Sequence, residues 1–100
     1  KRDIKDIRES PALDVIKLLE DHGARVQYND PYVPEVSWKN GKVKSVKLTA
    51  SLLKKADVTV ILTDHSQYNY QWIVDNATVV FDTRNATKKV RNNRGKIVLL

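Results

Sequence analysis

The stretch VTVIL at residues 58–62 decides the fold class of this chain. It is apolar or β-branched throughout, which is typical of a strand buried on both faces, as in a parallel sheet. The run at 78–81 has the same character, and the segment 97–100 predicts a final strand. A short helix capped by Thr49 is expected before the strand at 58–62, and a helix containing residues 70–74 is expected after it. Strands that alternate with helices in this way predict a mainly parallel α/β sheet.

The upstream half predicts one helix followed by strands. Ser10 and Pro11 are expected at its start, as the N-cap and the first helical residue. Apolar residues then recur at helical spacing: Ala12, Val15, Ile16 and Leu19. Gly23 predicts the end of the helix, where a left-handed residue is favoured. Residues 24–29 alternate between apolar and polar side chains, which predicts a strand, and Asn40-Gly41 predicts the turn of a small hairpin.

Together these elements predict an α/β fold, a Rossmann-like three-layer sandwich with a mainly parallel sheet. The first helix has no strand before it, although a βαβ unit requires one. We therefore expect the first strand to lie upstream of Lys1. With 100 residues, the chain is expected to be one domain that buries a modest core and is short for an independent enzyme.

The composition excludes several classes of protein. The chain is 41% hydrophobic and 30% charged, which is ordinary for a globular protein and too apolar for a disordered one. No apolar run approaches the length of a membrane span, and no signal-peptide pattern opens the chain. The chain has no cysteine, which excludes a disulfide scaffold, a thiolate zinc site and a cysteine nucleophile within these residues. This composition fits a cytoplasmic protein.

The net charge of +6 comes from one segment. Residues 84–96 hold six basic side chains and no acidic one, while the remaining residues carry 12 of each sign. We interpret the segment as solvated surface. The alternative is a nucleic-acid-binding module that uses 84–96. Against it, the aromatic residues of the chain are not interleaved with the basic ones, and no RNA- or DNA-binding motif is present. A flavodoxin- or receiver-like regulatory domain is a third possibility, but the chain lacks the acidic phospho-acceptor cluster that such a domain needs.

Candidate ligand-binding residues follow from the fold, because open α/β sheets bind ligands beyond the carboxyl ends of their strands. Three segments are expected there: 1–10, 63–66 and 82–85. His65 could be a general base or a metal ligand. The other histidine, His22, lies at the far end of a helix, and no acidic or histidine cluster has metal-ligand spacing. A packing or capping role for His65 is therefore the better interpretation, and no metal is expected.

Two arginines in these segments are candidates for binding a phosphate or a nucleotide. Arg8 precedes the first helix, whose free N–H groups attract anions, although it could instead pair with acidic neighbours on the surface. Arg84 follows a buried strand, and its planar guanidinium suits a diphosphate or the edge of a base. The alternative for Arg84 is a surface ion pair with Asp82.

Taken as a set, four motifs resemble the C-terminal domain of the UDP-glucose/GDP-mannose dehydrogenases. They are KRDIKDIRESPA at 1–12, DPYVP at 30–34, TDH at 63–65 and FDTR at 81–84. Each motif alone is weak, but all four occur in the family's order across most of the chain. The sequence DTRNAT at 82–87 is more similar to the bacterial and archaeal enzymes that act on UDP-N-acetylhexosamines than to the UDP-glucose enzymes.

The resemblance implies roles for three residues. Lys1 falls on the family's lysine that contacts the nucleotide-sugar, and Arg84 on the arginine that holds its uridine-ribose end, so both are expected to bind substrate. Arg8 falls on the arginine that reaches the pyrophosphate of NAD, the expected cofactor. The reaction implied is oxidation of the sugar C6 alcohol of a UDP-hexose or UDP-N-acetylhexosamine to the carboxylate, with two NAD consumed.

The resemblance also implies that the chain is part of a longer enzyme. Residues 1–100 would be its C-terminal nucleotide-sugar-binding domain, with the NAD-binding motif and the catalytic cysteine in upstream regions. No catalytic residue is therefore expected in these 100 residues, and the isolated fragment is expected to be inactive. Its expected partners are the UDP-sugar and the rest of its own enzyme, a homo-oligomer, with no nucleic acid or membrane partner.

Overall fold

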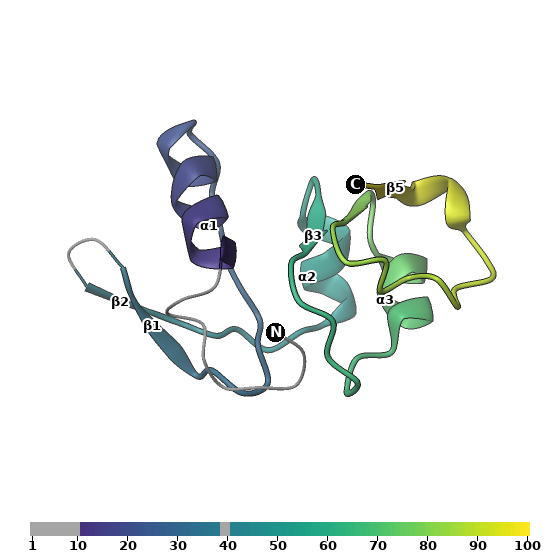
Figure 1. Ribbon diagram of the computed structural model, residues 1–100, viewed down its shortest axis with the longest axis horizontal. Coiled ribbons are helices and arrows are strands. Elements are labelled where there is room, and N and C mark those ends of the chain that lie inside the picture. Colours follow the sequence, from purple (N-terminus) through teal and green to yellow (C-terminus); the bar gives the residue numbers. More distant parts are fainter. Residues whose placement is uncertain (1–10, 39–40) are drawn as a thin grey trace. The chain divides into compact units, whose positions relative to one another are not determined.

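The computed structural model describes residues 11–38 and 41–100 (Figure 1). By contacts between Cα atoms, the chain divides into two compact units. Unit 1 ends at Lys47 and unit 2 comprises Leu48–Leu100. None of the helices in the described part of the chain is long and apolar enough to cross a membrane.

Unit 1 contains the first predicted helix, α1, which spans Pro11–Asp21. Its end has a specific geometry at Gly23, whose φ of 92° lies in the left-handed region. The Gly23 N–H donates to the carbonyl of Glu20 at 2.9 Å, and the Ala24 N–H donates to that of Leu19 at 3.1 Å. These two bonds form a Schellman motif, in which orphan carbonyls of the last helical turn find donors. Gly23 therefore ends α1 as predicted, while the expected cap at Ser10 lies outside the described residues.

The apolar face of α1 is only partly buried in unit 1. Ile16 is buried, as are Val33 and Val36 further along the chain, and together they are the buried apolar side chains of this unit among the described residues. Leu19, one turn after Ile16, remains 38% exposed, and Leu18 is more exposed still. Helical spacing thus identified the buried residue correctly but not how much of the face is covered.

The predicted hairpin is confirmed, whereas the predicted strand at 24–29 is wrong. Strands β1, Glu35–Trp38, and β2, Gly41–Lys44, pair in antiparallel register. Residues 24–30 have no regular structure and belong to neither sheet, although the Val46 N–H donates to the carbonyl of Tyr28 at 2.9 Å. Alternating side chains show which face of a strand would be apolar, but a strand also needs a neighbouring backbone with which to form a ladder.

Unit 2 confirms the predicted α/β class and its parallel sheet. Its three strands pair in the order β3-β4-β5, and both pairs are parallel. In chain order its elements are α2 (Ala50–Lys55), β3 (Thr59–Ile61), α3 (Tyr70–Asn76), β4 (Val80–Asp82), the 3-10 turn η1 (Arg94–Lys96) and β5 (Ile97–Leu99). A small sheet of this kind is consistent with a Rossmann-like domain.

Both helices of unit 2 begin at a side-chain cap. The Thr49 Oγ1 accepts the N–H of Leu52 at 3.1 Å, so the predicted cap of α2 is confirmed. The cap of α3 is Asn69, whose Oδ1 accepts the N–H of Trp72 at 3.0 Å. Such a cap satisfies one of the free N–H groups of the first turn.

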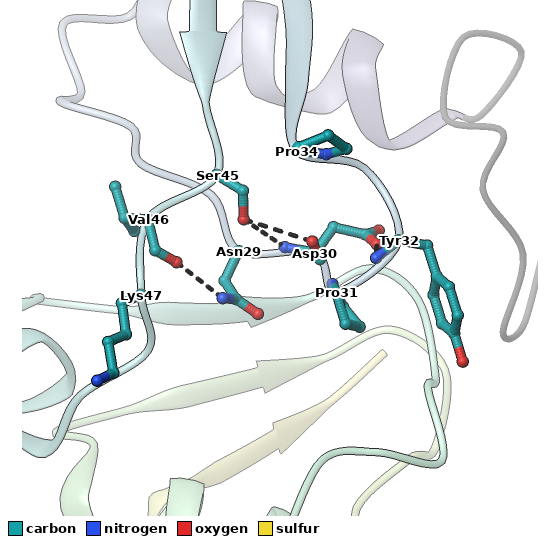
Figure 2. A pocket seen from close by; sticks show the side chains of 8 residues that line it. All are labelled: Asn29, Asp30, Pro31, Tyr32, Pro34, Ser45, Val46 and Lys47. Carbon is teal, nitrogen blue, oxygen red and sulfur yellow. Dashed lines mark hydrogen bonds between the residues drawn. The ribbon is translucent and has the colours of Figure 1, made fainter.

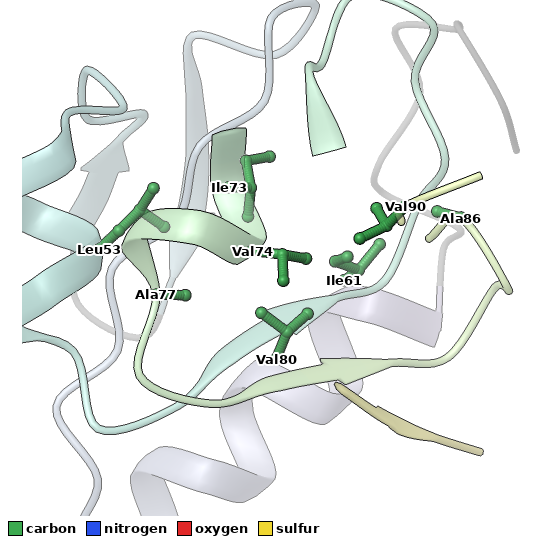
Figure 3. Packing of buried hydrophobic residues seen from close by; sticks show 8 residues of the cluster. All are labelled: Leu53, Ile61, Ile73, Val74, Ala77, Val80, Ala86 and Val90. Carbon is green, nitrogen blue, oxygen red and sulfur yellow. The ribbon is translucent and has the colours of Figure 1, made fainter. Parts of the chain in front are cut away.

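The core of unit 2 joins both helices to one face of the sheet (Figure 3). Val74 of α3 and Val80 of β4 have no exposed surface. Ala86 and Val90 also contribute, although they lie in the loop after β4, within the basic segment. The buried members of this cluster are Leu53, Ile61, Ile73, Val74, Ala77, Val80, Ala86 and Val90. The loop after β4 is therefore packed onto the core rather than detached from it.

The basic segment is a solvated surface only in part. The side chains of Arg84, Lys88, Lys89 and Arg91 are exposed, as expected. Arg94 is exposed as well, but its guanidinium donates to the carbonyls of Thr87 and Val90, at 2.9 and 2.7 Å. Lys96 donates to the carbonyls of Val74 and Asp75, both at 3.1 Å. These two cations bind backbone oxygens, including those at the C-terminal end of α3, where a positive charge is favoured.

Further contacts from α3 hold the same loop. The Gln71 side chain accepts the N–H groups of Arg91 and Asn92, at 2.9 and 3.3 Å, and donates to the Asn92 carbonyl at 3.1 Å. Asp75 accepts the side-chain amide of Asn93 at 2.9 Å. Hydrogen bonds from Asn93 and Gln71 hold the pKa of Asp75 below its usual value. The chain between β4 and β5 thus returns to the sheet along α3.

Replacing Lys96 with Met is expected to destabilise the protein measurably. Met keeps most of the aliphatic stem but leaves the carbonyls of Val74 and Asp75 without the ammonium donor. Since Lys96 is partly exposed and water can replace that donor, we expect a loss of about 1 kcal/mol. Urea unfolding followed by circular dichroism measures it. Lys89→Met is the matched control, because Lys89 is exposed in the same segment, and an equal loss in both variants would contradict this role for Lys96.

Candidate functional site

Two of the three predicted site segments lie at the same edge of the sheet in unit 2. Because β3 and β4 are parallel neighbours, the loops that follow Ile61 and Asp82 leave the sheet at its carboxyl edge. Thr83 links the loop after β4 to the end of β3, since both its N–H and its Oγ1 donate to the carbonyl of Ile61, at 3.1 and 2.6 Å. The third segment, 1–10, lies outside the described residues. The carboxyl edge of β3 and β4 is thus the candidate site.

Asp82, the last residue of β4, organises the loop that follows it. Its side chain is buried, with 1% of its surface exposed. One carboxylate oxygen, Oδ1, accepts the N–H groups of Arg84 and Ala86, at 3.0 and 3.1 Å. The other, Oδ2, accepts the N–H and the Oγ1 hydroxyl of Thr87, at 2.8 and 2.6 Å. Four donors from the loop therefore converge on one carboxylate.

These four bonds keep Asp82 ionised despite its burial. Burial by itself raises the pKa of this carboxyl, but the hydrogen bonds from Thr87, Arg84 and Ala86 outweigh it and lower the pKa overall. A carboxylate that accepts several N–H bonds behaves in this way. At neutral pH Asp82 is thus an acceptor for the loop and not a proton donor.

The guanidinium of Arg84 is exposed and is not paired with Asp82. It is the backbone N–H of Arg84 that the carboxylate accepts. Within the described part of the chain, the Arg84 side chain has no hydrogen bond or ion pair. The alternative of a surface ion pair between these two residues is therefore wrong. The reason is that the buried carboxylate is already occupied by backbone and hydroxyl donors.

The rest of the loop is fixed at three successive positions. Asn85 has a φ of 55°, in the left-handed region that asparagine tolerates better than most residues. Ala86 packs into the core, and Thr87 has no exposed surface. The backbone that carries Arg84 is thus held on both sides, while its charged end faces solvent.

The loop after β3 is built around a tyrosine hydroxyl. Tyr70 Oη accepts the N–H of His65 at 3.0 Å and donates to Oδ1 of Asp64 at 3.0 Å. Burial raises the pKa of Tyr70, so its hydroxyl remains protonated and can donate. The imidazole of His65 is buried and lies 5.9 Å from the ring of Tyr68, which fits the expected packing role. No group of three or more possible metal-ligating side chains occurs among the described residues.

Unit 1 has a shallow depression of its own, with a volume of about 670 Å³ (Figure 2). The Ser45 hydroxyl accepts the N–H of Asp30 at 3.0 Å, and the Asn29 side chain donates to the carbonyl of Val46 at 2.7 Å. Asp30 also accepts the N–H of Tyr32 at 2.8 Å, which shapes the turn of the DPYVP motif. The depression is lined by Asn29, Asp30, Pro31, Tyr32, Pro34, Ser45, Val46 and Lys47. The sequence showed the motif but not this depression, since Ser45 to Lys47 join it through tertiary contacts.

Of the three residues to which a ligand was assigned, the structure describes only Arg84. It lies at the carboxyl edge of the sheet, as expected for a ligand-binding residue in an open α/β fold. Lys1 and Arg8 lie outside the described residues. Asp82 and Thr87, which shape the loop that carries Arg84, were not predicted, although the hydroxyl five residues after an acidic strand end was visible in the sequence.

Comparison with known proteins identifies the family. The model of the UDP-glucose/GDP-mannose dehydrogenase family, UDP binding domain, matches residues 1–89. The chain is 37% identical over 84 residues to a UDP-N-acetyl-D-mannosamine dehydrogenase from Yersinia pestis. This match covers 75% of the chain and 20% of that relative. The chain is also 35% identical over 71 residues to a UDP-N-acetyl-D-mannosamine dehydrogenase from Campylobacter jejuni. That match covers 68% of the chain and 17% of the relative.

The comparisons also set the extent of the match. The chain spans about a fifth of the length of these curated relatives. No solved structure matches it significantly. The family match covers the loop after β3, the whole of β4 and the Asp82–Thr87 loop. The chain therefore belongs to the UDP-glucose/GDP-mannose dehydrogenase family and corresponds to its UDP binding domain.

Proposed function

We propose that this chain is the C-terminal nucleotide-sugar-binding domain of an NAD-dependent UDP-sugar 6-dehydrogenase. The observation that carries the proposal is the exposed guanidinium of Arg84 at the carboxyl edge of a parallel sheet. Its backbone is fixed by Asp82, and its side chain has no partner among the described residues, so it is available to a ligand. A planar guanidinium with several donors suits a nucleotide.

The proposed substrate is a UDP-N-acetylhexosamine. The relatives from Yersinia pestis and Campylobacter jejuni both carry the name UDP-N-acetyl-D-mannosamine dehydrogenase, which favours an N-acetylated sugar over UDP-glucose. The proposed reaction converts the C6 alcohol of the sugar to a carboxylate. NAD, when bound, would accept the hydride, and two NAD would be consumed for each sugar. Because the sequence motifs resemble those of this family, we also propose that the complete enzyme is a cytoplasmic homo-oligomer.

Within this proposal, the chain contributes binding groups rather than the bond-breaking chemistry. Arg84 holds the uridine-ribose end of the substrate, and Lys1 contacts the nucleotide-sugar as well. Arg8 is assigned to the NAD pyrophosphate, for which a guanidinium that can donate two parallel hydrogen bonds is suited. The chain contains no cysteine, so the catalytic cysteine of the family would come from another part of the enzyme.

The proposal is tested by comparing UDP-sugar binding with nucleic-acid binding in the complete enzyme. We expect UDP-N-acetylmannosamine to bind saturably in calorimetry. Changing Lys88, Lys89 and Arg91 together to Gln should leave that binding nearly unchanged, because these side chains are exposed outside the proposed site. Double-stranded DNA should not compete. Tight DNA binding that weakens steeply with salt and is abolished by the triple variant, with no UDP-sugar binding, would overturn the proposal.

A further inference from the structure

The loop that carries Arg84 is built around a buried charge, which is a costly way to shape a turn. Removing a carboxylate from water costs several kcal/mol unless hydrogen bonds replace its hydration. The side chain of Asp82 is 1% exposed, and its replacement donors all come from the next five residues of the loop. An apolar residue at the end of β4 would avoid this cost but would give the loop no common acceptor.

The bonds of Asp82 determine where the backbone of Arg84 lies. Oδ1 accepts the Arg84 N–H directly and the Ala86 N–H two residues later, so it spans the left-handed residue Asn85 between them. Oδ2 accepts both donors of Thr87, whose side chain is fully buried. The carboxylate therefore fixes the loop at both of its ends. Hydrogen bonds to a charged acceptor are also stronger than neutral ones, so the arrangement is rigid.

We propose that Asp82 and Thr87 are positioning residues for the nucleotide-sugar, which act on the ligand only through Arg84. The inference rests on the proposed function, because it takes Arg84 as the residue that holds the uridine end. A side chain on a preordered backbone loses less conformational freedom on binding than one on a mobile loop, so its affinity is higher. Neither Asp82 nor Thr87 needs to touch the ligand, since the side chains of both are buried.

Asp82→Asn is the first variant that tests this role. The amide keeps the shape of the carboxylate, but one of its two oxygens becomes an NH₂ group. Oδ1 can still accept from Arg84 and Ala86, whereas the amide nitrogen then faces the N–H of Thr87, donor against donor. We expect the KM for the UDP-sugar in the complete enzyme to rise about three- to tenfold, with kcat within about twofold of the parent.

Thr87→Val is the second variant, in case Asp82→Asn does not fold. Valine matches threonine in shape and removes only the hydroxyl that donates to Oδ2 at 2.6 Å. A smaller rise in KM, about two- to fivefold, is expected, and Thr87→Ser should restore the parent value because serine retains the hydroxyl. Thr49→Ala is the control for general destabilisation, since it removes the cap of α2 in the same unit. It should lower the melting temperature without changing the KM.

A double-variant cycle separates a positioning role from a structural one. If Asp82 acts through Arg84, adding Asp82→Asn to Arg84→Ala should raise the KM by less than about twofold beyond Arg84→Ala alone. The same addition should still lower the melting temperature, because the lost loop bonds do not depend on the guanidinium. A KM effect of Asp82→Asn that is equally large with and without Arg84 would overturn the inference.

The failure of this inference can be told apart from that of the proposed function. If Arg84→Ala raises the KM but Asp82→Asn and Thr87→Val leave it at the parent value, the positioning role is overturned while the assignment of Arg84 stands. If Arg84→Ala itself leaves UDP-sugar binding unchanged, the assignment of Arg84 fails, and the inference fails with it.

Discussion

Val74→Asp is expected to unfold unit 2. Val74 has no exposed surface and lies in the cluster of α3, β3 and β4 side chains, whose buried members are all apolar and offer a carboxylate no hydrogen-bond donor (Figure 3). Burying an unpaired charge, together with the lost apolar contacts, costs on the order of 5 kcal/mol or more. A small unit of this size has a total stability of only about 5 kcal/mol, so its native state should be largely lost.

Circular dichroism and thermal unfolding of Val74→Asp measure this effect. Ser51→Asp is the matched control, because it introduces the same carboxylate at an exposed position in the first turn of α2. An acidic residue there is neutral or slightly stabilising, since it lies near the positive end of the helix dipole. A cooperative unfolding transition for Val74→Asp near that of the parent would contradict the assigned core.

Arg84→Ala in the complete enzyme is expected to raise the KM for the UDP-sugar about tenfold or more, while kcat falls much less. In the proposed function Arg84 holds the uridine end, far from the reacting C6, so its binding energy would be the same in the ground and transition states and would appear in KM. The loop that carries Arg84 is fixed at Asp82, so removal of the side chain should leave the backbone in place. Steady-state kinetics with the UDP-sugar and NAD varied in turn provide the measurement.

Arg84→Lys separates geometry from charge at the same position. Lysine retains the positive charge but loses the planar arrangement of donors, so its KM should also rise, close to the value for Ala. The KM for NAD should hardly change in either variant. Lys88→Ala is the control, since Lys88 is exposed in the same loop. UDP-sugar constants equal to the parent in both Arg84 variants would show that Arg84 is not a substrate residue.

The order and type of most elements in this chain could be predicted from the sequence alone. VTVIL at 58–62 predicted a strand of a parallel sheet, and β3 lies within it. Gly23 and Thr49 marked the end of α1 and the start of α2 correctly. These features depend on interactions within a few residues, such as a cap, a positive φ or a run of β-branched side chains. The family motifs were also legible for this reason, because each is a short contiguous stretch.

Only the tertiary structure decided which groups those elements bring together. The stretch 24–29 has the alternation of a strand but belongs to no sheet, because its pairing depends on a distant backbone. The sequence predicts that Lys96 is one more solvated cation, yet it binds carbonyls at the end of α3, more than twenty residues earlier. For Arg84, the sequence leaves open the alternative of an ion pair with Asp82, since the two opposite charges are two residues apart. In the structure the carboxylate of Asp82 is buried, so it needs hydrogen-bond donors inside the protein, and N–H groups of the loop backbone supply them. The guanidinium of Arg84 is therefore not needed as a partner for Asp82 and remains exposed.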